Sequence, residues 1–217
     1  MARLNVNPTR MELNRLKARV TTARRGHKLL KDKRDELMKQ FLDIVRENKE
    51  LRERVEAALI RAQKGFTVAS AIMSPEQMEQ ALLYPKQSMT LSIDYRNIMS
   101  VDVPKYSFQL KNDDPSEIYP YSFATTSGEL DDAVGALSSV TEDLLRLAET
   151  EKSAQLLAQE IEKTRRRVNA LEYVMIPQLD ETIRYIVMKL DENERGNVTR
   201  LMKVKDMMIA EQFEAKQ

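Results

Sequence analysis

The sequence has no cysteine, no tryptophan and only one histidine, His27. Without cysteine the chain can form neither disulfides nor thiolate metal sites, which is compatible with a reducing compartment. A zinc site would need carboxylates alone, an unusual ligand set. The phosphate-binding patterns GxxxxGK(S/T) and GxGxxG are missing as well. We therefore predict no catalytic, metal-binding or cofactor-binding residues, no cofactor, and a protein that is not an enzyme by itself.

Aromatic residues, glycine and long apolar runs are also scarce. Aromatic side chains make up 6% of the 217 residues and glycine occupies five positions, whereas 32% of the residues are charged. Such a composition is typical of an elongated helical protein. No apolar run approaches the roughly 20 residues that span a bilayer, and the first residues lack the apolar core of a signal peptide. We expect a soluble, cytoplasmic chain without direct membrane insertion.

What the sequence does contain is an apolar stripe whose spacings alternate between three and four residues. It begins at Leu13, ends at Ala62, and is interrupted only by His27, Arg34 and Asn48. A period of 3.5 residues sustained over seven heptads predicts a coiled-coil helix. Its apolar face needs a partner helix. The polar positions are either tolerated or set the register, and packing between helices is favoured for His27 over a role as general base or ligand.

Helix-breaking residues divide the chain into three segments, residues 1–64, 65–128 and 129–217. Thr9 and Glu12 have the spacing of a capping box, which predicts that the first helix starts there. No proline follows before Gly65, so the helix is expected to run to that point. The middle segment holds five of the seven prolines and five of the seven tyrosines, and is therefore different in kind.

The middle segment is predicted to be a small insert. Ser74 as cap and Pro75 at the first helical position predict a short helix to about Leu83. Apolar alternation with period two predicts strands at 89–95 and 99–103, joined at Arg96-Asn97 as a β-hairpin over residues 88–103. Because an isolated hairpin is barely stable, we expect it to rest on the helices. The remaining residues, 104–127, are predicted to form an extended loop.

The third segment repeats the helical pattern. Thr126 and Glu129 are compatible with a second capping box, and apolar positions recur from Leu130 onward to Leu201, Val204 and Met208. Phase slips near residues 154–158 and 175–179 are typical of stutters, and Pro177 predicts a bend without a stop. One chain supplies both stripes, which favours an intramolecular pair over a parallel dimer. The predicted fold class is mainly α: two long helices in an antiparallel coiled coil, with a central insert containing a short helix and a β-hairpin.

Charge is distributed unevenly although the net charge is only +1. Residues 1–34 contain eleven Lys or Arg against two acids, a balance of +9. The clusters Arg24-Arg25 and Arg165-Arg166-Arg167 suit a solvated helical face, a protein-binding face or, less favoured, nucleic acid. The basic region of a DNA-binding zipper lies outside the heptads, whereas here the stripe runs through the basic part. We therefore predict no nucleic acid as partner.

Several long stretches resemble one known family, the D subunits of the V-type rotary ATPases of archaea and bacteria. The resemblance covers essentially the whole chain. At the start it rests on Asn7-Pro8-Thr9-Arg10 with residues 13–17, and on residues 26–37 from Gly26-His27-Lys28 to Asp35-Glu36-Leu37. Near the end it rests on residues 165–172, on the step Ile176-Pro177 and on residues 182–186. The sequence is most similar to the sodium-translocating enzymes of the enterococcal type.

The resemblance implies a rotor axle, the central stalk. In that family both terminal helices pair and insert into the hexamer of catalytic A and non-catalytic B subunits, while the hairpin region binds the small F subunit and a further protein capping the membrane ring. ATP hydrolysis turns the axle and so drives ion translocation by the ring. The chain is then expected to be peripheral, on the cytoplasmic face of the membrane.

These roles imply two sets of candidate partner-binding residues. Because the inserted end is basic, we expect acidic loops of the hexamer to contact Arg10, Arg15, Arg19, Arg24, Arg25, Arg200 and Lys203. The apolar hairpin positions are expected on the side of the F subunit, at Leu91, Ile93, Tyr95, Val101 and Val103.

Other interpretations remain open from the residues alone. A coiled-coil scaffold or tether would show the same stripes but would tend to dimerise. The γ-subunit of F-type enzymes also pairs its terminal helices, but around a larger α/β domain than this insert allows. An enzyme with a coiled-coil arm would need a catalytic domain larger than the insert. The sequence leaves open the coupling ion, the direction of the reaction and the individual contacts.

Overall fold

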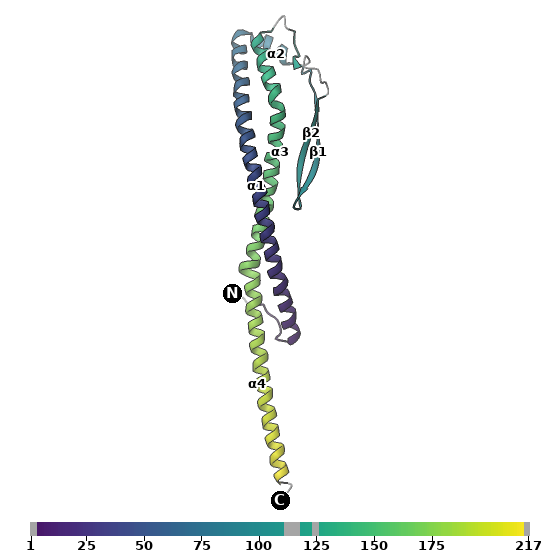
Figure 1. Cartoon of the computed structure of the whole chain (residues 1–217), viewed down its shortest axis with the longest axis vertical. Helices are drawn as coiled ribbons and strands as arrows, with labels where there is room; N and C mark the ends of the chain where they lie inside the picture. Colours follow the sequence, from purple (N-terminus) through teal and green to yellow (C-terminus); the bar gives the residue numbers. More distant parts are fainter. Residues whose placement is uncertain (1–3, 111–117, 123–125, 215–217) are drawn as a thin grey trace. The chain divides into compact units, whose positions relative to one another are not determined.

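The computed structural model describes residues 4–110, 118–122 and 126–214 and is mainly helical (Figure 1). The long helices are α1 (Arg10–Ile72), α3 (Gly128–Ala170) and α4 (Ile176–Glu214), with a π-helical turn, η2 (Leu171–Met175), between the last two. The insert consists of the short helix α2 (Pro75–Leu82) and the strands β1 (Met89–Ile98) and β2 (Val101–Leu110). The predicted fold class is confirmed: long paired helices carry an insert with a short helix and a hairpin.

The residues form two compact units. The terminal unit contains residues 1–34 and 163–217, and the central unit contains residues 35–162. Helix α1 contributes its first part to the terminal unit and the rest to the central unit. The boundaries predicted at residues 64 and 128 separate segments along the sequence, whereas these two units are groups of residues in contact. The three-segment division of the chain therefore stays a prediction.

In the terminal unit, the start of α1 packs antiparallel to α4. Leu16, Val20, Leu179 and Ile186 form the buried cluster, and Leu4 packs against it from the segment preceding α1. The backbone N–H of Leu4 also donates to Thr182 Oγ1 at 3.2 Å. Ion pairs join Arg10 to Glu194 and Arg24 to Asp180, so rising residue numbers on α1 meet falling ones on α4.

The first helix begins with a cap on one side only. The N–H of Glu12 donates to Thr9 Oγ1 at 3.2 Å, which is the predicted N-cap bond. The Glu12 carboxylate accepts a bond from Arg15 at 3.1 Å instead of reaching back to the cap. The predicted helix start is therefore confirmed, with a single capping bond taken from Thr9.

The irregularity before Pro177 is a π-helical turn. Residues Leu171–Met175 adopt this wider turn, and the N–H of Ile176 bonds to the carbonyl of Leu171 five residues earlier. Pro177 has no N–H to give to the helix, and its ring disfavours regular α geometry in the preceding turn. The extra residue of a π-turn shifts the helical phase, in agreement with the phase slip predicted at 175–179. The helix continues past Pro177, as expected.

In the central unit, α1 and α3 pair through the predicted stripe. Leu37, Leu51, Val55 and Ala62 are buried on α1, and the buried partners on α3 are Leu130, Ala133, Val140, Leu157 and Ile161. The polar seam residue Asn48 donates a hydrogen bond to Thr150 Oγ1 at 3.4 Å. Helix α1 continues past Gly65 to Ile72, beyond the predicted end.

The hairpin is longer than predicted, and its turn lies elsewhere. The strands pair antiparallel from Met89 with Leu110 to Ile98 with Val101. Met99 and Ser100 form the turn with φ of 49° and 71°, so the predicted link at Arg96-Asn97 is wrong. Both residues occupy the left-handed region that a type I′ turn requires. The predicted loop over 104–127 is also wrong for residues 104–110, which belong to β2.

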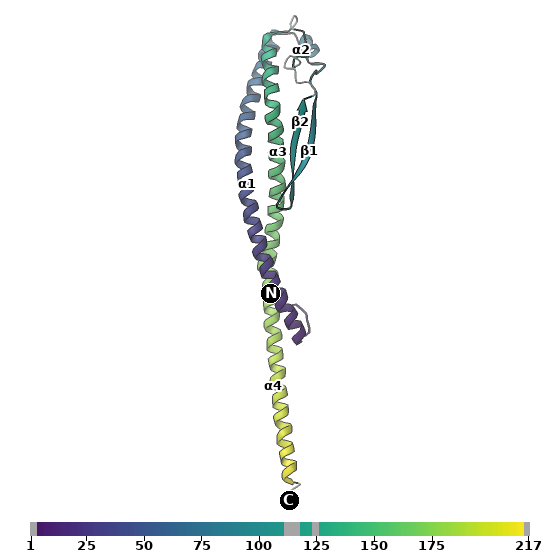
Figure 2. The same cartoon turned by 45° about the vertical axis from the view of Figure 1, so that its right-hand side comes forward.

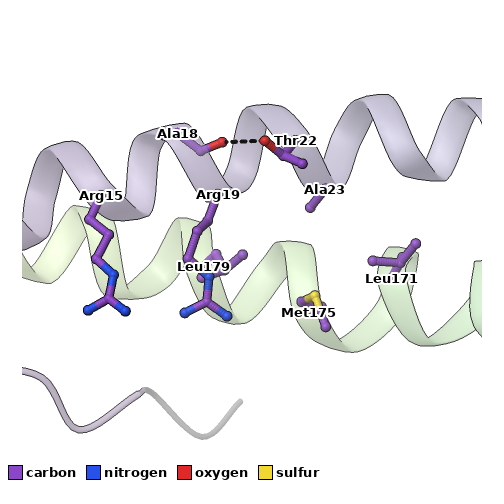
Figure 3. A pocket seen from close by; sticks show the side chains of 8 residues that line it. All are labelled: Arg15, Ala18, Arg19, Thr22, Ala23, Leu171, Met175 and Leu179. Atoms are coloured by element: carbon purple, nitrogen blue, oxygen red, sulfur yellow. Dashed lines mark hydrogen bonds between the residues drawn. The ribbon is translucent and has the colours of Figure 1, made fainter.

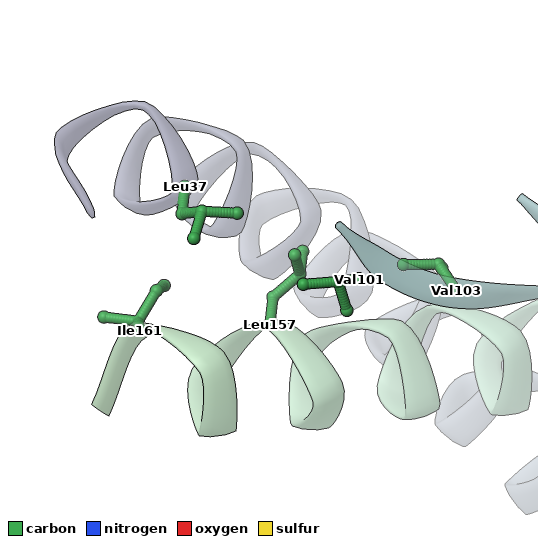
Figure 4. Close-up of a cluster of buried hydrophobic side chains, with 5 residues drawn as sticks. All are labelled: Leu37, Val101, Val103, Leu157 and Ile161. Carbon is green, nitrogen blue, oxygen red and sulfur yellow. The ribbon is translucent and has the colours of Figure 1, made fainter. Parts of the chain in front are cut away.

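The tip of the hairpin rests on the helices of the central unit. Val101 and Val103 are buried in one cluster with Leu37 of α1 and with Leu157 and Ile161 of α3 (Figure 4). The N–H of Tyr106 on β2 donates to Glu149 of α3 at 3.0 Å, and Figure 2 shows β1 and β2 running beside α3. Pro104 is tolerated in this strand because every second N–H of an edge strand points away from its partner. The expected support for the hairpin is thus confirmed.

The segment around α2 closes the end of the α1–α3 pair. Ser74 Oγ accepts from Gln77 N–H, and the Gln77 side chain bonds back to Ser74 N–H, which is a complete capping box. Met73 and Ala81 are buried against Ala69 and Leu130. The second predicted capping box does not form, because Thr126 Oγ1 donates to the carbonyl of Ser122 and Ser127 Oγ has no partner among the described residues.

Candidate functional site

The candidate functional sites in the described part of the chain are exposed surfaces. Within these residues no cluster of three or more His, Asp or Glu side chains could hold a metal ion. Among the same residues, none of the helices could span a membrane. His27 lies half-buried between the helices, with Nε2 3.3 Å from Glu172 Oε2. The structure therefore directs attention to partner-binding surfaces.

The first surface is the part of α4 that continues beyond its pairing with α1. The ion pair of Arg10 with Glu194 marks the start of α1. Seven apolar side chains that follow are between 40% and 68% exposed: Val198, Leu201, Met202, Val204, Met207, Met208 and Ile209. The stripe that placed Leu201, Val204 and Met208 against a helix of the same chain is therefore wrong for this part. Contiguous exposed apolar surface of this kind marks a site for another protein.

The basic candidates all lie in the terminal unit, but their surroundings differ. Arg10 pairs with Glu194 at 3.8 Å, Arg15 with Glu12 at 3.1 Å, and Arg24 with Asp180 at 2.9 Å. Arg19 and Arg25 form no ion pair with any residue that the structure describes. Acids on α4 thus neutralise part of the basic excess that the sequence shows, and Arg19 and Arg25 retain full charge for a partner.

The last two basic candidates lie on the exposed part of α4. Arg200 and Lys203 are both exposed, and the Arg200 guanidinium lies 3.5 Å from Asn197 Oδ1. They are set among the exposed apolar residues and follow Glu194 along the helix. The surface therefore combines apolar area with positive charge, whereas Arg10 and Arg24 of α1 are paired with acids of α4.

The second surface is one face of the hairpin. Leu91, Ile93 and Tyr95 of β1 are 42%, 48% and 72% exposed. Directly opposite on β2, and therefore on the same face, lie Phe108 and Tyr106, which are half-buried, and Pro104, which is buried. Sequence reasoning missed Tyr106 and Phe108 because it ended the strand at residue 103. Their alternation with Leu110 falls on even positions, out of phase with Val101 and Val103.

The five hairpin candidates do not share one surface. Val101 and Val103 are 8% and 7% exposed and pack on α1 and α3. As free partner-binding residues they are wrong, because the helices of the same unit cover them. The turn at Met99-Ser100 puts them on the face opposite Leu91, Ile93 and Tyr95.

A third apolar surface lies at the end of the α1–α3 pair and was not predicted. Ile72, Leu83 and Tyr84 are 63%, 58% and 77% exposed, close in sequence to α2. The only signal in the sequence was the run Leu82-Leu83-Tyr84 directly before Pro85. Its position after a short capped helix gives this end of the central unit an exposed apolar edge.

Comparison with known proteins decides the family. A model of the family of ATP synthase D subunits matches residues 12–206. The chain belongs to this family. It is 68% identical over 209 residues to the D subunit of the V-type ATP synthase of Acetivibrio thermocellus, covering 96% of this chain and 94% of the relative. For the corresponding D subunit of Clostridioides difficile the identity is 65% over 216 residues, covering 100% of this chain and 97% of the relative.

Membership of the D-subunit family confirms the resemblance seen in the sequence. The chain is a non-catalytic central-stalk subunit of a V-type rotary ATPase. The match to residues 12–206 includes both the hairpin and most of the exposed part of α4. A scaffold or tether without a rotary role is thereby set aside. The sodium type of the enzyme stays a prediction, because the names of these relatives state no coupling ion.

Proposed function

We propose that this D subunit is the torque-transmitting axle between a hexamer of A and B subunits and the ion-translocating membrane ring. The terminal unit enters the hexamer, and the central unit binds the F subunit and the protein that caps the ring. The enzyme complex holds the chain peripherally on the cytoplasmic face of the membrane. The coupled ion is sodium or a proton.

One observation carries the proposal, namely the exposed apolar surface on α4 beyond Glu194. A helix that showed these seven side chains to water would be an aggregation liability unless a partner covered them. A ring of subunits around the helix provides such a cover on every side, whereas a flat partner would bury one face only. Arg200 and Lys203 on the same part of α4 fit acidic loops in that ring.

Continuity of the helices supports the transmission of torque. Helix α1 runs without a break from Arg10 to Ile72, and so belongs to both units. The second continuous helical segment consists of α3, η2 and α4, and its backbone hydrogen bonding continues through the π-turn. Two paired helices resist twisting better than one, because their buried side chains interlock.

Native mass spectrometry of the chain mixed with the A and B hexamer tests this proposal. We expect one copy of this chain per hexamer, and one copy of the F subunit bound to that complex but not to the hexamer alone. A homodimer that ignores the hexamer would overturn the proposal. Replacing Leu91 and Ile93 by serine should release the F subunit and leave the hexamer bound, since both side chains are exposed on the hairpin.

A charge series tests the electrostatic part. Neutralising Arg10, Arg15, Arg19, Arg24 and Arg25 should weaken assembly with the hexamer and flatten its dependence on salt, because exposed charges attract a partner over about 10 Å at 0.1 M salt. If the affinity of the variant and of the parent chain stays the same at every salt concentration, electrostatic attraction does not contribute to binding. The predicted stoichiometry of one chain per hexamer would be unaffected by that result.

A further inference from the structure

A shallow groove lies between α1 and the π-turn in the terminal unit (Figure 3). Ala18, Thr22 and Ala23 line it on α1, and Leu171, Met175 and Leu179 line it on η2 and α4. Its volume is about 420 Å³. The groove exists because small side chains of α1 face large apolar ones and cannot fill the space above them.

The π-turn contributes to this groove. Leu171, Met175 and Leu179 follow one another at spacings of four and four, whereas a regular heptad seam alternates three and four. A wider turn absorbs the extra residue and keeps all three side chains along one groove. Met175 nevertheless remains 45% exposed, because Ala23 and Ala18 are too short to cover it.

Positive charge surrounds the groove. Arg15 and Arg19 line it, and residues 15–25 contain five Lys or Arg and no acid. The nearest acids of the facing helix are occupied, since Glu172 pairs with His27 and Asp180 with Arg24. Arg15 forms an ion pair with Glu12, but Arg19 has no ion partner within the described part of the chain.

We propose that this groove binds a segment of the A and B hexamer in which a large apolar side chain stands beside an Asp or Glu. The apolar side chain covers Leu171 and Met175, and the carboxylate takes the guanidinium of Arg19, with Arg15 beside it. Arginine suits this role because its planar group binds a carboxylate through two hydrogen bonds. The inference rests on the proposed function and adds which residues of the axle contact the hexamer.

Two variants of equal charge separate this contact from a general attraction. Arg19→Gln and Lys17→Gln each remove one positive charge from exposed positions on α1, but only Arg19 lines the groove. We expect Arg19→Gln to weaken binding to the hexamer about tenfold, the size of a lost charge-assisted hydrogen bond. Lys17→Gln should change it less than about twofold. Equal losses of hexamer binding for both variants would overturn the proposal that the groove binds a segment of the hexamer.

Filling the groove provides a second test that does not change charge. Ala18 is exposed, so Ala18→Trp can cover Leu171 and Met175 without disturbing the buried cluster. The variant should keep its helical circular dichroism and lose binding to a similar extent as Arg19→Gln. Binding at the level of the parent chain would show that the groove stays empty in the complex.

The absence of cysteine in the sequence permits a direct identification of the bound segment. A single cysteine at Ala18, labelled with a photoreactive benzophenone, should cross-link to a peptide of A or B that contains an acid next to a large apolar residue. Thr21→Cys, exposed but outside the groove, is the control. A complex that forms without a cross-link from position 18 overturns the inference, and a chain that does not bind the hexamer at all overturns the proposed function instead.

Discussion

At the scale of single residues, the two glycines within α1 have opposite surroundings. A Cβ added at Gly65 would lie 3.0 Å from Ala133 Cβ, whereas one at Gly26 would meet no atom within 4 Å. Alanine is favoured over glycine inside a helix by about 1 kcal/mol. Gly26→Ala should therefore raise the free energy of unfolding by about 0.5–1 kcal/mol. Gly65→Ala should lower it by about 1–2 kcal/mol, since α1 and α3 must move apart.

Urea unfolding followed by helical circular dichroism checks this pair of variants. Both substitutions add the same methyl group to the same helix, so each is the control for the other. A stabilising Gly65→Ala would mean that the two helices tolerate a wider spacing than the contact with Ala133 indicates.

The raised pKa of Tyr121 leads us to expect a loss of folding stability at alkaline pH. Burial, and then its hydrogen bond of 2.7 Å to Asp131, raise the pKa of Tyr121 well above its ordinary value. The folded state thus holds this proton more tightly than the unfolded chain, whose tyrosines ionise near about pH 10. The stabilisation is complete below that pH and is lost as the pH rises toward the raised pKa.

The variant Tyr121→Phe isolates that contribution. It should unfold at a lower temperature than the parent chain at pH 8, and the difference should shrink above about pH 10. Tyr84→Phe is the control, because Tyr84 is 77% exposed. A difference that stays constant with pH would assign the effect to packing of the ring instead of the phenol proton.

Which residues are buried between the helices could largely be predicted from the spacing of apolar residues alone. Leu16, Leu37, Leu51 and Val55 were assigned to the seam and are buried. Spacing failed for Leu201, Val204 and Met208, because the same apolar period serves a partner in another chain as well as one in this chain. It also gave no sign of which arginines are neutralised, since Arg24 and Asp180 are far apart in the sequence.

At the scale of elements, the hairpin has one face that packs on the helices and one face that we propose as a binding surface for a partner. Replacing Val101 and Val103 by serine should lower the stability of the central unit by about 3–5 kcal/mol, the cost of exposing two buried side chains. Replacing Leu91 and Ile93 should change it by less than about 1 kcal/mol, because these side chains are already half exposed. Thermal unfolding of the two double variants measures the difference, and equal losses would contradict the assignment of faces.

The position of the hairpin turn could not be predicted. Favoured two-residue turns contain Asn-Gly or Asp-Gly, but here Met99 and Ser100 adopt positive φ without either. Asn97 helps from outside the turn, since its Oδ1 accepts from Ser100 N–H at 3.1 Å and its amide donates to Asp102 at 2.7 Å. The burial of Val101 and Val103 on the helices also fixes this register, and such packing is invisible in a local pattern.

The exposed part of α4 should be dispensable for folding and required for assembly. Truncation after Asn197 removes apolar side chains that are largely exposed to solvent, so the melting temperature of the remainder should change by less than about 2 °C. Binding to the hexamer should be lost. The same truncation would contradict the account if it unfolded the terminal unit or left hexamer binding intact.

At the scale of the whole molecule, the family could be identified from long sequence matches, whereas its working surfaces could not. The stretches around Gly26-His27-Lys28 and Ile176-Pro177 were enough to indicate a D subunit, and a match over residues 12–206 confirms it. The hairpin surface required the register of β1 and β2, and the groove required the π-turn. Both depend on contacts between residues that lie apart in the chain.

Rotation of a single complex shows whether this chain is the axle of the enzyme. The hexamer is fixed to a surface and a bead is attached through one cysteine introduced at exposed Ser92 on the hairpin. On addition of ATP, we expect the bead to turn in one direction with three pauses per revolution, one for each catalytic interface. A complex that hydrolyses ATP while the bead only fluctuates about a fixed angle would contradict the role of this chain as the axle.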